Sequence, residues 1–190
     1  RGSISNQMLQ VLTGKAKGRK LKVPKGKTVR PTTSRIKKSI FDTLGDLSGL
    51  KALDIFAGSG SLGIEALSHE AAHVTFIEKS PFVFKVLREN VSVCGFLDKA
   101  TLIFAHYEGA LKRLHKSGKK FDLIFIDPPY ILYGKQQVDD FIDGVSQLLE
   151  KEGVIVIEHN YKIGHTCAGF IRVTKSFGGT QVSFFRRGEE

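Results

Sequence analysis

Strand-like apolar runs alternate with helical patterns along most of the chain, and this alternation restricts the possible folds more than any other feature of the sequence. We expect strands at residues 52–56, 73–77, 101–105, 121–126 and 154–157. Between them, apolar residues recur at helical spacing near residues 64–67, 82–91, 107–115 and 136–149. This order predicts a doubly wound α/β fold with a parallel sheet. Two further runs, 170–177 and 181–185, flank two glycines and predict a C-terminal antiparallel hairpin.

The first 45 residues do not follow the alternation and predict a separate N-terminal unit. Short β-capable runs at 8–13 and 20–23 predict a small hairpin. A helix is expected to start within Pro31–Ser34 and to end at Gly45. We therefore divide the chain into an N-terminal hairpin and helix, 8–45, and an α/β domain, 46–190. Residues 1–7 precede the only methionine and are expected to be an expression scar or a disordered extension.

Positive charge is concentrated in this N-terminal unit. The net charge is +10, and residues 1–40 hold twelve of the 29 Lys and Arg residues and none of the 19 acidic ones. Such a run can be a solvated tail, but Leu9, Val11 and Leu21 are interleaved with the charges and allow the segment to fold against the domain. A folded basic surface of this density most often binds phosphate, so we expect a nucleic acid partner.

Composition disfavours several other classes of protein. Cys94 and Cys167 are too few and too scattered for a disulfide framework or a zinc cluster, and the six histidines lack the spacing of metal ligands. No apolar run approaches the roughly 18 residues that span a membrane, and the chain shows no secretory leader. We therefore expect a cytoplasmic monomer with no bound metal and no membrane contact.

A glycine-rich loop after the first predicted strand indicates a nucleotide-like ligand. Gly58, Gly60 and Gly63 would let the backbone approach a ligand closely at the start of a helix. Glu78 ends the next strand, where a carboxylate can accept hydrogen bonds from ribose hydroxyls. The glycine spacing also fits a dinucleotide site, so an NAD-dependent oxidoreductase is an alternative. Asp54, four residues before Gly58, suits a cationic ligand better than a pyrophosphate.

The sequence Asp127-Pro128-Pro129-Tyr130 follows the fourth predicted strand and indicates the chemistry of the site. If the first and fourth strands are neighbours, Asp127 and the glycine loop face one crevice. A proline pair can simply end a strand, but that leaves the acid and the aromatic ring unexplained. The Asp127 carboxylate and the Pro128 carbonyl can accept the two hydrogens of an exocyclic base amine and direct its lone pair at a methyl donor. Tyr130 offers a face on which an extruded base can stack.

These motifs resemble the class I S-adenosylmethionine-dependent methyltransferases that modify amino groups, which have a Rossmann-like fold. The stretches 12–21 and 30–35 are similar, more narrowly, to the bacterial 16S ribosomal RNA (guanine-N2)-methyltransferases, and the likeness covers nearly the whole chain. The resemblance implies S-adenosyl-L-methionine as cofactor, the N2 amine of a guanine in 16S ribosomal RNA as acceptor, and ribosomal RNA or the small ribosomal subunit as partner.

The resemblance also implies roles for individual residues. The expected cofactor contacts are Asp54, Phe56, Gly58, Ser59, Gly60, Glu78, Lys79 and His106. The expected RNA contacts are Arg19, Lys20, Lys22, Arg30, Thr32, Arg35 and Lys38. His106 departs from the family pattern, because many relatives have Asp or Asn where it stands, although a neutral imidazole can accept the same hydrogen bond from the adenine amine.

Two further alternatives share part of this pattern. A DNA adenine-N6 methyltransferase would use the same Asp-Pro-Pro-Tyr motif, but 190 residues leave little room for the target-recognition region that such enzymes usually need. A catalytically idle RNA-binding assembly factor would have no need of Asp127 and Tyr130.

Overall fold

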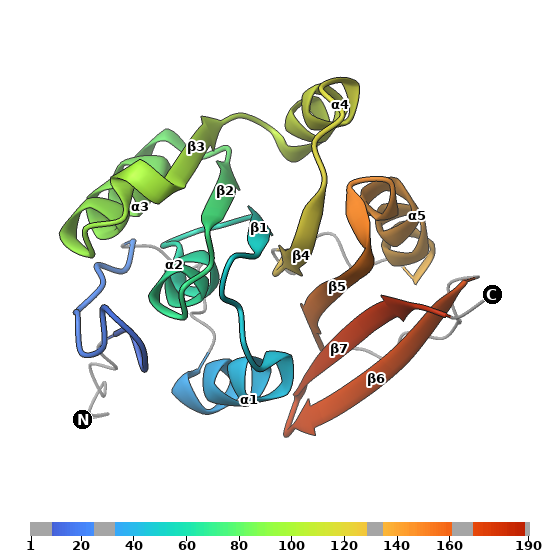
Figure 1. The fold of residues 1–190 in the computed structure, drawn as a ribbon, viewed down its shortest axis with the longest axis horizontal. Helices are drawn as coiled ribbons and strands as arrows, with labels where there is room; N and C mark the ends of the chain where they lie inside the picture. The colour runs from blue at the N-terminus through green and yellow to red at the C-terminus, as the bar shows by residue number, and fades with distance from the viewer. Residues whose placement is uncertain (1–8, 25–32, 129–134, 161–168, 189–190) are drawn as a thin grey trace, which may run out of the picture.

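The computed structural model describes residues 9–24, 33–128, 135–160 and 169–188, and for residues 135–140 it describes the backbone only (Figure 1). The helices are α1 (Ser34–Leu44), α2 (Ser61–Ser68), α3 (Pro81–Val93), α4 (Tyr107–Lys116) and α5 (Lys135–Ser146), with a short 3₁₀ turn at Leu97–Lys99. The strands are β1 (Lys51–Ile55), β2 (His73–Glu78), β3 (Ala100–Phe104), β4 (Phe121–Ile126), β5 (Leu149–His159), β6 (Phe170–Phe177) and β7 (Thr180–Arg187). Within these residues no helix is both long enough and apolar enough to cross a membrane.

One seven-stranded sheet organises the molecule, with the strand order β3-β2-β1-β4-β5-β7-β6. The first five strands in this order pair in parallel, whereas β7 pairs antiparallel with β5 and β6 pairs antiparallel with β7. The predicted doubly wound α/β fold and the C-terminal antiparallel hairpin are both confirmed. The strand order reverses between β1 and β4, and parallel α/β sheets bind ligands at such a switch point.

Helices cover both faces of the sheet, which explains why the sequence of β4 is almost continuously apolar. Helices α1, α2 and α3 lie on one face, and α4 and α5 on the other (Figure 1). Leu123 and Phe125 of β4 pack in the cluster on the first face, and Ile124 and Ile126 pack in the cluster on the second. Successive residues of a strand point to opposite faces, so a strand covered on both faces is apolar throughout.

The N-terminal segment, residues 9–24, packs on the first face as an irregular hairpin, without two regular strands. Its two runs approach in antiparallel fashion through one bridge between Gln10 and Lys20, flanked by backbone hydrogen bonds. Beyond this bridge, the N–H groups of Leu12 and Thr13 donate to the Glu65 side chain of α2. The segment also contributes Leu9, Val11, Ala16 and Leu21 to the core cluster on this face.

The two largest differences from the predicted boundaries lie between α5 and β5. Helix α5 ends at Ser146 rather than at residue 149, and β5 begins at Leu149 rather than at residue 154. Leu149 pairs with Phe121 of β4, after which the register shifts before Leu123 pairs with Val154. The three exposed polar residues after Leu149 occupy this irregularity, which hides the early start of the strand from a simple apolar pattern.

Candidate active site

The ends of β1, β4 and β2 bring the predicted cofactor loop, Asp127 and Glu78 to one edge of the sheet. Ile55, the last residue of β1, pairs with Ile126, the last residue of β4. The loop that begins at Phe56 and the motif that begins at Asp127 therefore leave the sheet side by side, on strands about 5 Å apart. The condition on which the shared crevice depends, that the first and fourth strands are neighbours, is met.

The loop between β1 and α2 has a tightly specified backbone. Gly58 and Gly60 have positive φ angles of 56° and 83°, and Phe56 has a φ of 63°. This left-handed region is unfavourable for a residue with a β-carbon by roughly 1–2 kcal/mol, so Phe56 is held there by its surroundings. The Gly60 N–H donates to the Ala57 carbonyl oxygen at 2.7 Å, which closes the turn just before α2.

Glu78 is joined directly to this loop. Its Oε2 accepts a hydrogen bond from the Gly58 N–H at 3.0 Å, and its Oε1 accepts one from the Ser80 N–H at 2.8 Å. These two bonds fix the carboxylate at the end of β2. Each carboxylate oxygen has a further lone pair, so Glu78 can still accept hydrogen bonds from a pair of ribose hydroxyls. Lys79, next in the chain, is exposed.

Asp54 of β1 is buried and binds the backbone of helix α2. Its side chain is only 3% exposed, and its Oδ2 accepts a hydrogen bond from the Gly63 N–H at 2.9 Å. Burial raises the pKa of Asp54 to about 7, despite the opposing effect of the Gly63 hydrogen bond. The carboxyl group therefore titrates near neutral pH. Its contact with a cationic ligand stays a prediction.

A β-carbon would meet different surroundings at Gly58, Gly60 and Gly63. A β-carbon on Gly60 would lie 2.5 Å from the Leu87 Cδ1 atom of α3, and one on Gly63 would lie 2.2 Å from the Phe76 ring. Both glycines therefore allow α2 to pack closely against its neighbours. A β-carbon on Gly58 would instead point into open space, 3.9 Å from the nearest atom. Gly58 is thus the position at which the backbone is open to the approach of a ligand.

Phe56 and Tyr107 connect the loop to the helices of the second face. Their ring centroids are 4.9 Å apart, and each ring also packs against Phe141 of α5. Phe56 therefore packs against both the start of α4 and the helix that follows the Asp127 motif. His106, just before α4, is half exposed, and its Nδ1 atom is 3.7 Å from Oε2 of Glu108. Its predicted contact with the cofactor adenine remains a prediction.

Asp127 and Pro128 follow β4 directly and are partly buried. Pro129 and Tyr130 lie outside the described residues, as do Arg30, Thr32 and Cys167. Cys94 is a free, partly buried thiol whose pKa is raised by burial, which suits a structural role. Among the residues that the structure describes, no group of His, Cys, Asp and Glu side chains could hold a metal ion.

The predicted RNA-binding cations differ in their surroundings. Lys22 pairs with Glu89 at 2.8 Å, and Lys38 pairs with Asp42 at 2.6 Å. Arg19, Lys20 and Arg35 are exposed and form no ion pair within the described part of the chain.

A buried ion pair between Lys37 and Glu65 was not expected from the charge pattern. The Nζ and Oε2 atoms are 2.8 Å apart, and each side chain is 1% exposed. Lys37 also donates to the Gln10 carbonyl oxygen and to the Ser61 hydroxyl. Two signals could have revealed the pair: Lys37 stands between Ile36 and Ile40 in a helix, and Glu65 lies in an otherwise small and apolar helix.

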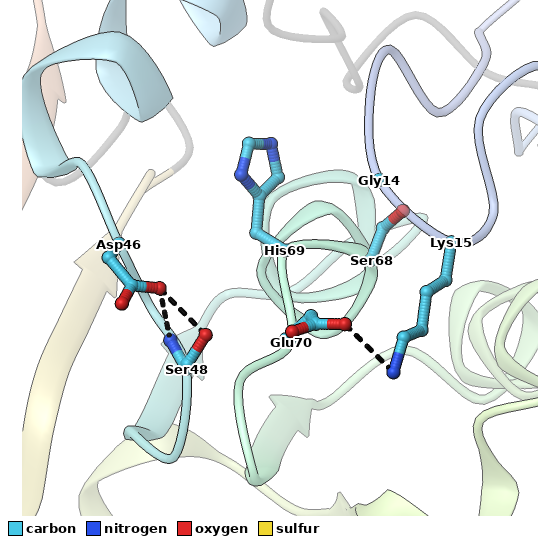
Figure 2. Close-up of a pocket in the computed structure, with 7 residues that line it drawn as sticks. All are labelled: Gly14, Lys15, Asp46, Ser48, Ser68, His69 and Glu70. Atoms are coloured by element: carbon cyan, nitrogen blue, oxygen red, sulfur yellow. Dashed lines mark hydrogen bonds and ion pairs between the residues drawn. The ribbon is translucent and has the colours of Figure 1, made fainter.

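A solvent-open pocket of about 510 Å³ lies near the amino end of β1 (Figure 2). It is lined by Gly14, Lys15, Asp46, Ser48, Ser68, His69 and Glu70. Its walls are the N-terminal segment, the end of α2 with the residues just after it, and the segment before β1. The predicted cofactor loop lies instead at the start of α2. Asp46 bonds with Ser48, and Lys15 pairs with Glu70, so much of the charge in the pocket is already compensated.

Comparisons with known proteins identify relatives of this chain. The chain is 34% identical over 183 residues to "Putative rRNA methyltransferase YlbH" of Bacillus subtilis (strain 168), with 94% of this chain and 99% of that protein covered. It is 36% identical over 123 residues to "Ribosomal RNA small subunit methyltransferase D" of Escherichia coli (strain K12), a match that covers 64% of this chain and 60% of that protein.

The fold is shared with solved structures as well. A hypothetical protein of Thermus thermophilus superposes with a TM-score of 0.80 at 30% identity, covering 94% of this chain and 99% of that one. The model of one family, described as conserved hypothetical protein 95, matches residues 9–186. Since this match spans nearly the whole chain, and relatives over 30% identical are named as ribosomal RNA methyltransferases, the chain belongs to the conserved hypothetical protein 95 family of Rossmann-like methyltransferases.

Proposed function

We propose that this chain transfers a methyl group from S-adenosylmethionine to the exocyclic N2 amine of a guanine in small-subunit ribosomal RNA. The observation that carries the proposal is the pairing of Ile55 with Ile126, which sets the loop at Gly58 beside Asp127 at the switch point of the sheet. A cofactor site and an amine-binding motif that meet at one sheet edge are what such a transfer requires.

The cofactor site is assigned to the loop and to Glu78. Gly58 offers an open approach to the backbone, and Glu78, held by the Gly58 and Ser80 N–H groups, presents its remaining lone pairs to ribose hydroxyls. Asp54, Phe56, Ser59 and Lys79 surround this position along the chain, and His106 follows the neighbouring strand β3. S-adenosylmethionine supplies an electrophilic methyl group bound to a cationic sulfur.

The catalytic role is assigned to the motif after β4. The Asp127 carboxylate and the Pro128 carbonyl oxygen accept the two hydrogens of the base amine, which frees the nitrogen lone pair from conjugation with the ring. A nitrogen–carbon bond then forms as the sulfur–carbon bond breaks, and Asp127 takes the proton that the amine releases. The fixed φ angle of proline keeps its carbonyl acceptor rigid, so little reorganisation is needed during the reaction. Tyr130 stacks on the extruded base.

The choice of ribosomal RNA rests on the relatives and on the charge distribution. Both relatives described above are named as ribosomal RNA methyltransferases, and the one from Escherichia coli is named for the small subunit. All the excess positive charge lies in the first 40 residues, where Arg19, Lys20 and Arg35 are exposed. RNA is recognised largely by shape and by accessible bases in loops, which suits a partly or fully assembled subunit as substrate.

The substrate is tested by incubating the protein and labelled S-adenosylmethionine with small ribosomal subunits that lack the modification. Nucleosides released from the RNA are then separated and identified. We expect N2-methylguanosine, formed faster on subunits than on short naked RNA. N6-methyladenosine as the sole product would instead assign the protein to the adenine-modifying enzymes that share the Asp127 motif.

A further inference from the structure

Asn90, on the third turn of α3, binds two segments that are far apart in the sequence. Its side chain is 2% exposed. Its Oδ1 atom accepts a hydrogen bond from the Lys22 N–H at 2.8 Å, and its Nδ2 group donates to the Lys22 carbonyl oxygen at 2.9 Å. The same Nδ2 group donates its second hydrogen to the Ser59 carbonyl oxygen at 2.9 Å. One buried amide therefore joins the basic N-terminal segment to the loop between β1 and α2.

The Ser59 contact completes the support of that loop. The Gly58 N–H is held by Glu78, and the Gly60 N–H is held by the Ala57 carbonyl oxygen. The Ser59 carbonyl oxygen lies between these two groups in the chain and is held by Asn90. A displacement of the loop by a bound ligand therefore changes the hydrogen bonds of Asn90, and a displacement of Lys22 does the same.

Other anchors of the N-terminal segment do not reach the loop. The Ser68 hydroxyl, at the far end of α2, accepts a hydrogen bond from the Ala16 N–H at 2.9 Å and donates to the Thr13 carbonyl oxygen. Ser68 is fully buried, like Asn90, but its partners belong only to the N-terminal segment. A substitution of Ser68 therefore weakens only the attachment of the N-terminal segment. A substitution of Asn90 also removes the connection of that segment to the loop between β1 and α2.

We propose that Asn90 is a positioning residue that couples the basic N-terminal segment to the cofactor loop, so that a bound cofactor orders the segment that receives RNA. This inference rests on the proposed function for the ligands of the two sites. The Lys22 peptide groups and the Ser59 carbonyl oxygen bind the same Asn90 amide, through its Oδ1 atom and both Nδ2 hydrogens. A rotation of this amide therefore changes its hydrogen bonds to both segments. Coupling of this kind is reciprocal: RNA held by the segment tightens cofactor binding by the same factor.

Hydrogen exchange of the full chain tests the coupling without requiring RNA. S-adenosylhomocysteine is the probe, and its binding is first measured by calorimetry. In the unaltered protein we expect the bound probe to slow exchange of the Lys22 amide, and of the other hydrogen-bonded amides of residues 9–22, by about fivefold or more, the lower end of typical coupling factors. Binding without added protection at Lys22 overturns the inference and leaves the proposed function standing. Failure of the probe to bind at all overturns both.

Matched variants identify the residue responsible. In Asn90→Ala, the probe still binds, but the added protection of residues 9–22 is lost. Asn90→Asp keeps the size of the side chain and the acceptor for the Lys22 N–H, so it serves as the second variant if the alanine variant does not melt cooperatively. In the control, Ser68→Ala, the segment exchanges faster overall, yet the probe still slows it. Equal protection by the probe in the Asn90 variants and in the unaltered protein would show that Asn90 is only a packing residue.

RNA provides the reciprocal measurement. A short RNA from the small subunit should tighten probe binding by about fivefold or more in the unaltered protein and in Ser68→Ala at saturating RNA. In the Asn90 variants, the probe affinity should be the same with and without RNA. Enhancement by RNA that survives in these variants contradicts the proposal.

Discussion

Lys37 of α1 and Glu65 of α2 form a buried ion pair, and the same Glu65 carboxylate accepts hydrogen bonds from the Leu12 and Thr13 N–H groups. The pair therefore joins α1, α2 and the N-terminal segment. Removal of one member of a buried pair leaves an uncompensated charge, which typically costs about 3–5 kcal/mol.

We accordingly expect Lys37→Met to lower the free energy of unfolding by about 3–5 kcal/mol. The double variant Lys37→Met with Glu65→Gln should recover part of this loss, because glutamine removes the unpaired charge and keeps an acceptor for Leu12 and Thr13. Urea unfolding measures both. A loss below about 1 kcal/mol in the single variant would match an exposed ion pair and contradict the buried one.

Substitutions at Gly58 and Gly60 should distinguish an effect on cofactor binding from an effect on the packing of the fold. Gly58→Ala places a methyl group in open space, so we expect weaker cofactor binding and a stability loss limited to the roughly 1–2 kcal/mol of a left-handed alanine. Gly60→Ala drives a methyl group into Leu87 and should mainly destabilise the fold. Calorimetry with S-adenosylhomocysteine and thermal unfolding distinguish the two effects. Unchanged affinity in Gly58→Ala would move the ligand away from this position.

Asp54 should make stability depend on pH in an unusual direction. Its pKa in the folded chain is raised by burial from an ordinary value near 3.8 to about 7, so the folded state holds the proton over this range and the unfolded state does not. The contribution of Asp54 to the free energy of unfolding is therefore fully present below about pH 4 and is lost as the pH rises to about 7.

The comparison variant is Asp54→Asn, whose side-chain oxygen can still accept the Gly63 N–H. Relative to this variant, the unaltered protein should lose up to about 4 kcal/mol of unfolding free energy between pH 4 and pH 8, from about three pKa units. Chemical unfolding at a series of pH values gives the difference. A difference that stays constant, or that grows in favour of the unaltered protein, would mean that Asp54 is ionised throughout.

The surface cations should differ in their contribution to RNA binding. Neutralising Arg19, Lys20 and Arg35 together should weaken binding and flatten the logarithmic salt dependence by roughly 0.7–0.9 for each phosphate that the protein no longer neutralises. Neutralising Lys22 and Lys38, which pair with Glu89 and Asp42, should flatten it less per charge removed. Filter binding at several salt concentrations measures the slopes. Identical slopes for the triple variant and the unaltered protein would show that these three side chains do not contact RNA phosphates.

The sequence predicts the sheet and the place of the site because these depend on local patterns. Continuous apolar character in β4 follows from cover on both faces, and the strand–helix order limits where β1 and β4 can lie. The partners of Lys37 and Asn90 could not be predicted in this way, since each contacts residues more than 20 positions away in the chain. The early start of β5 was missed because exposed residues at its irregular beginning interrupt the apolar pattern.

The central claim is that the glycine loop and Asp127 form one reaction centre at the paired ends of β1 and β4. The most direct test is the single-turnover rate of methyl transfer to small ribosomal subunits in Asp127→Ala, with cofactor affinity measured in the same preparation. We predict a rate reduced by about a hundredfold or more with unchanged cofactor affinity, because the variant removes a preorganised partner of the reacting amine. A nearly normal rate would contradict the claim and leave Asp127 a structural residue at the end of β4.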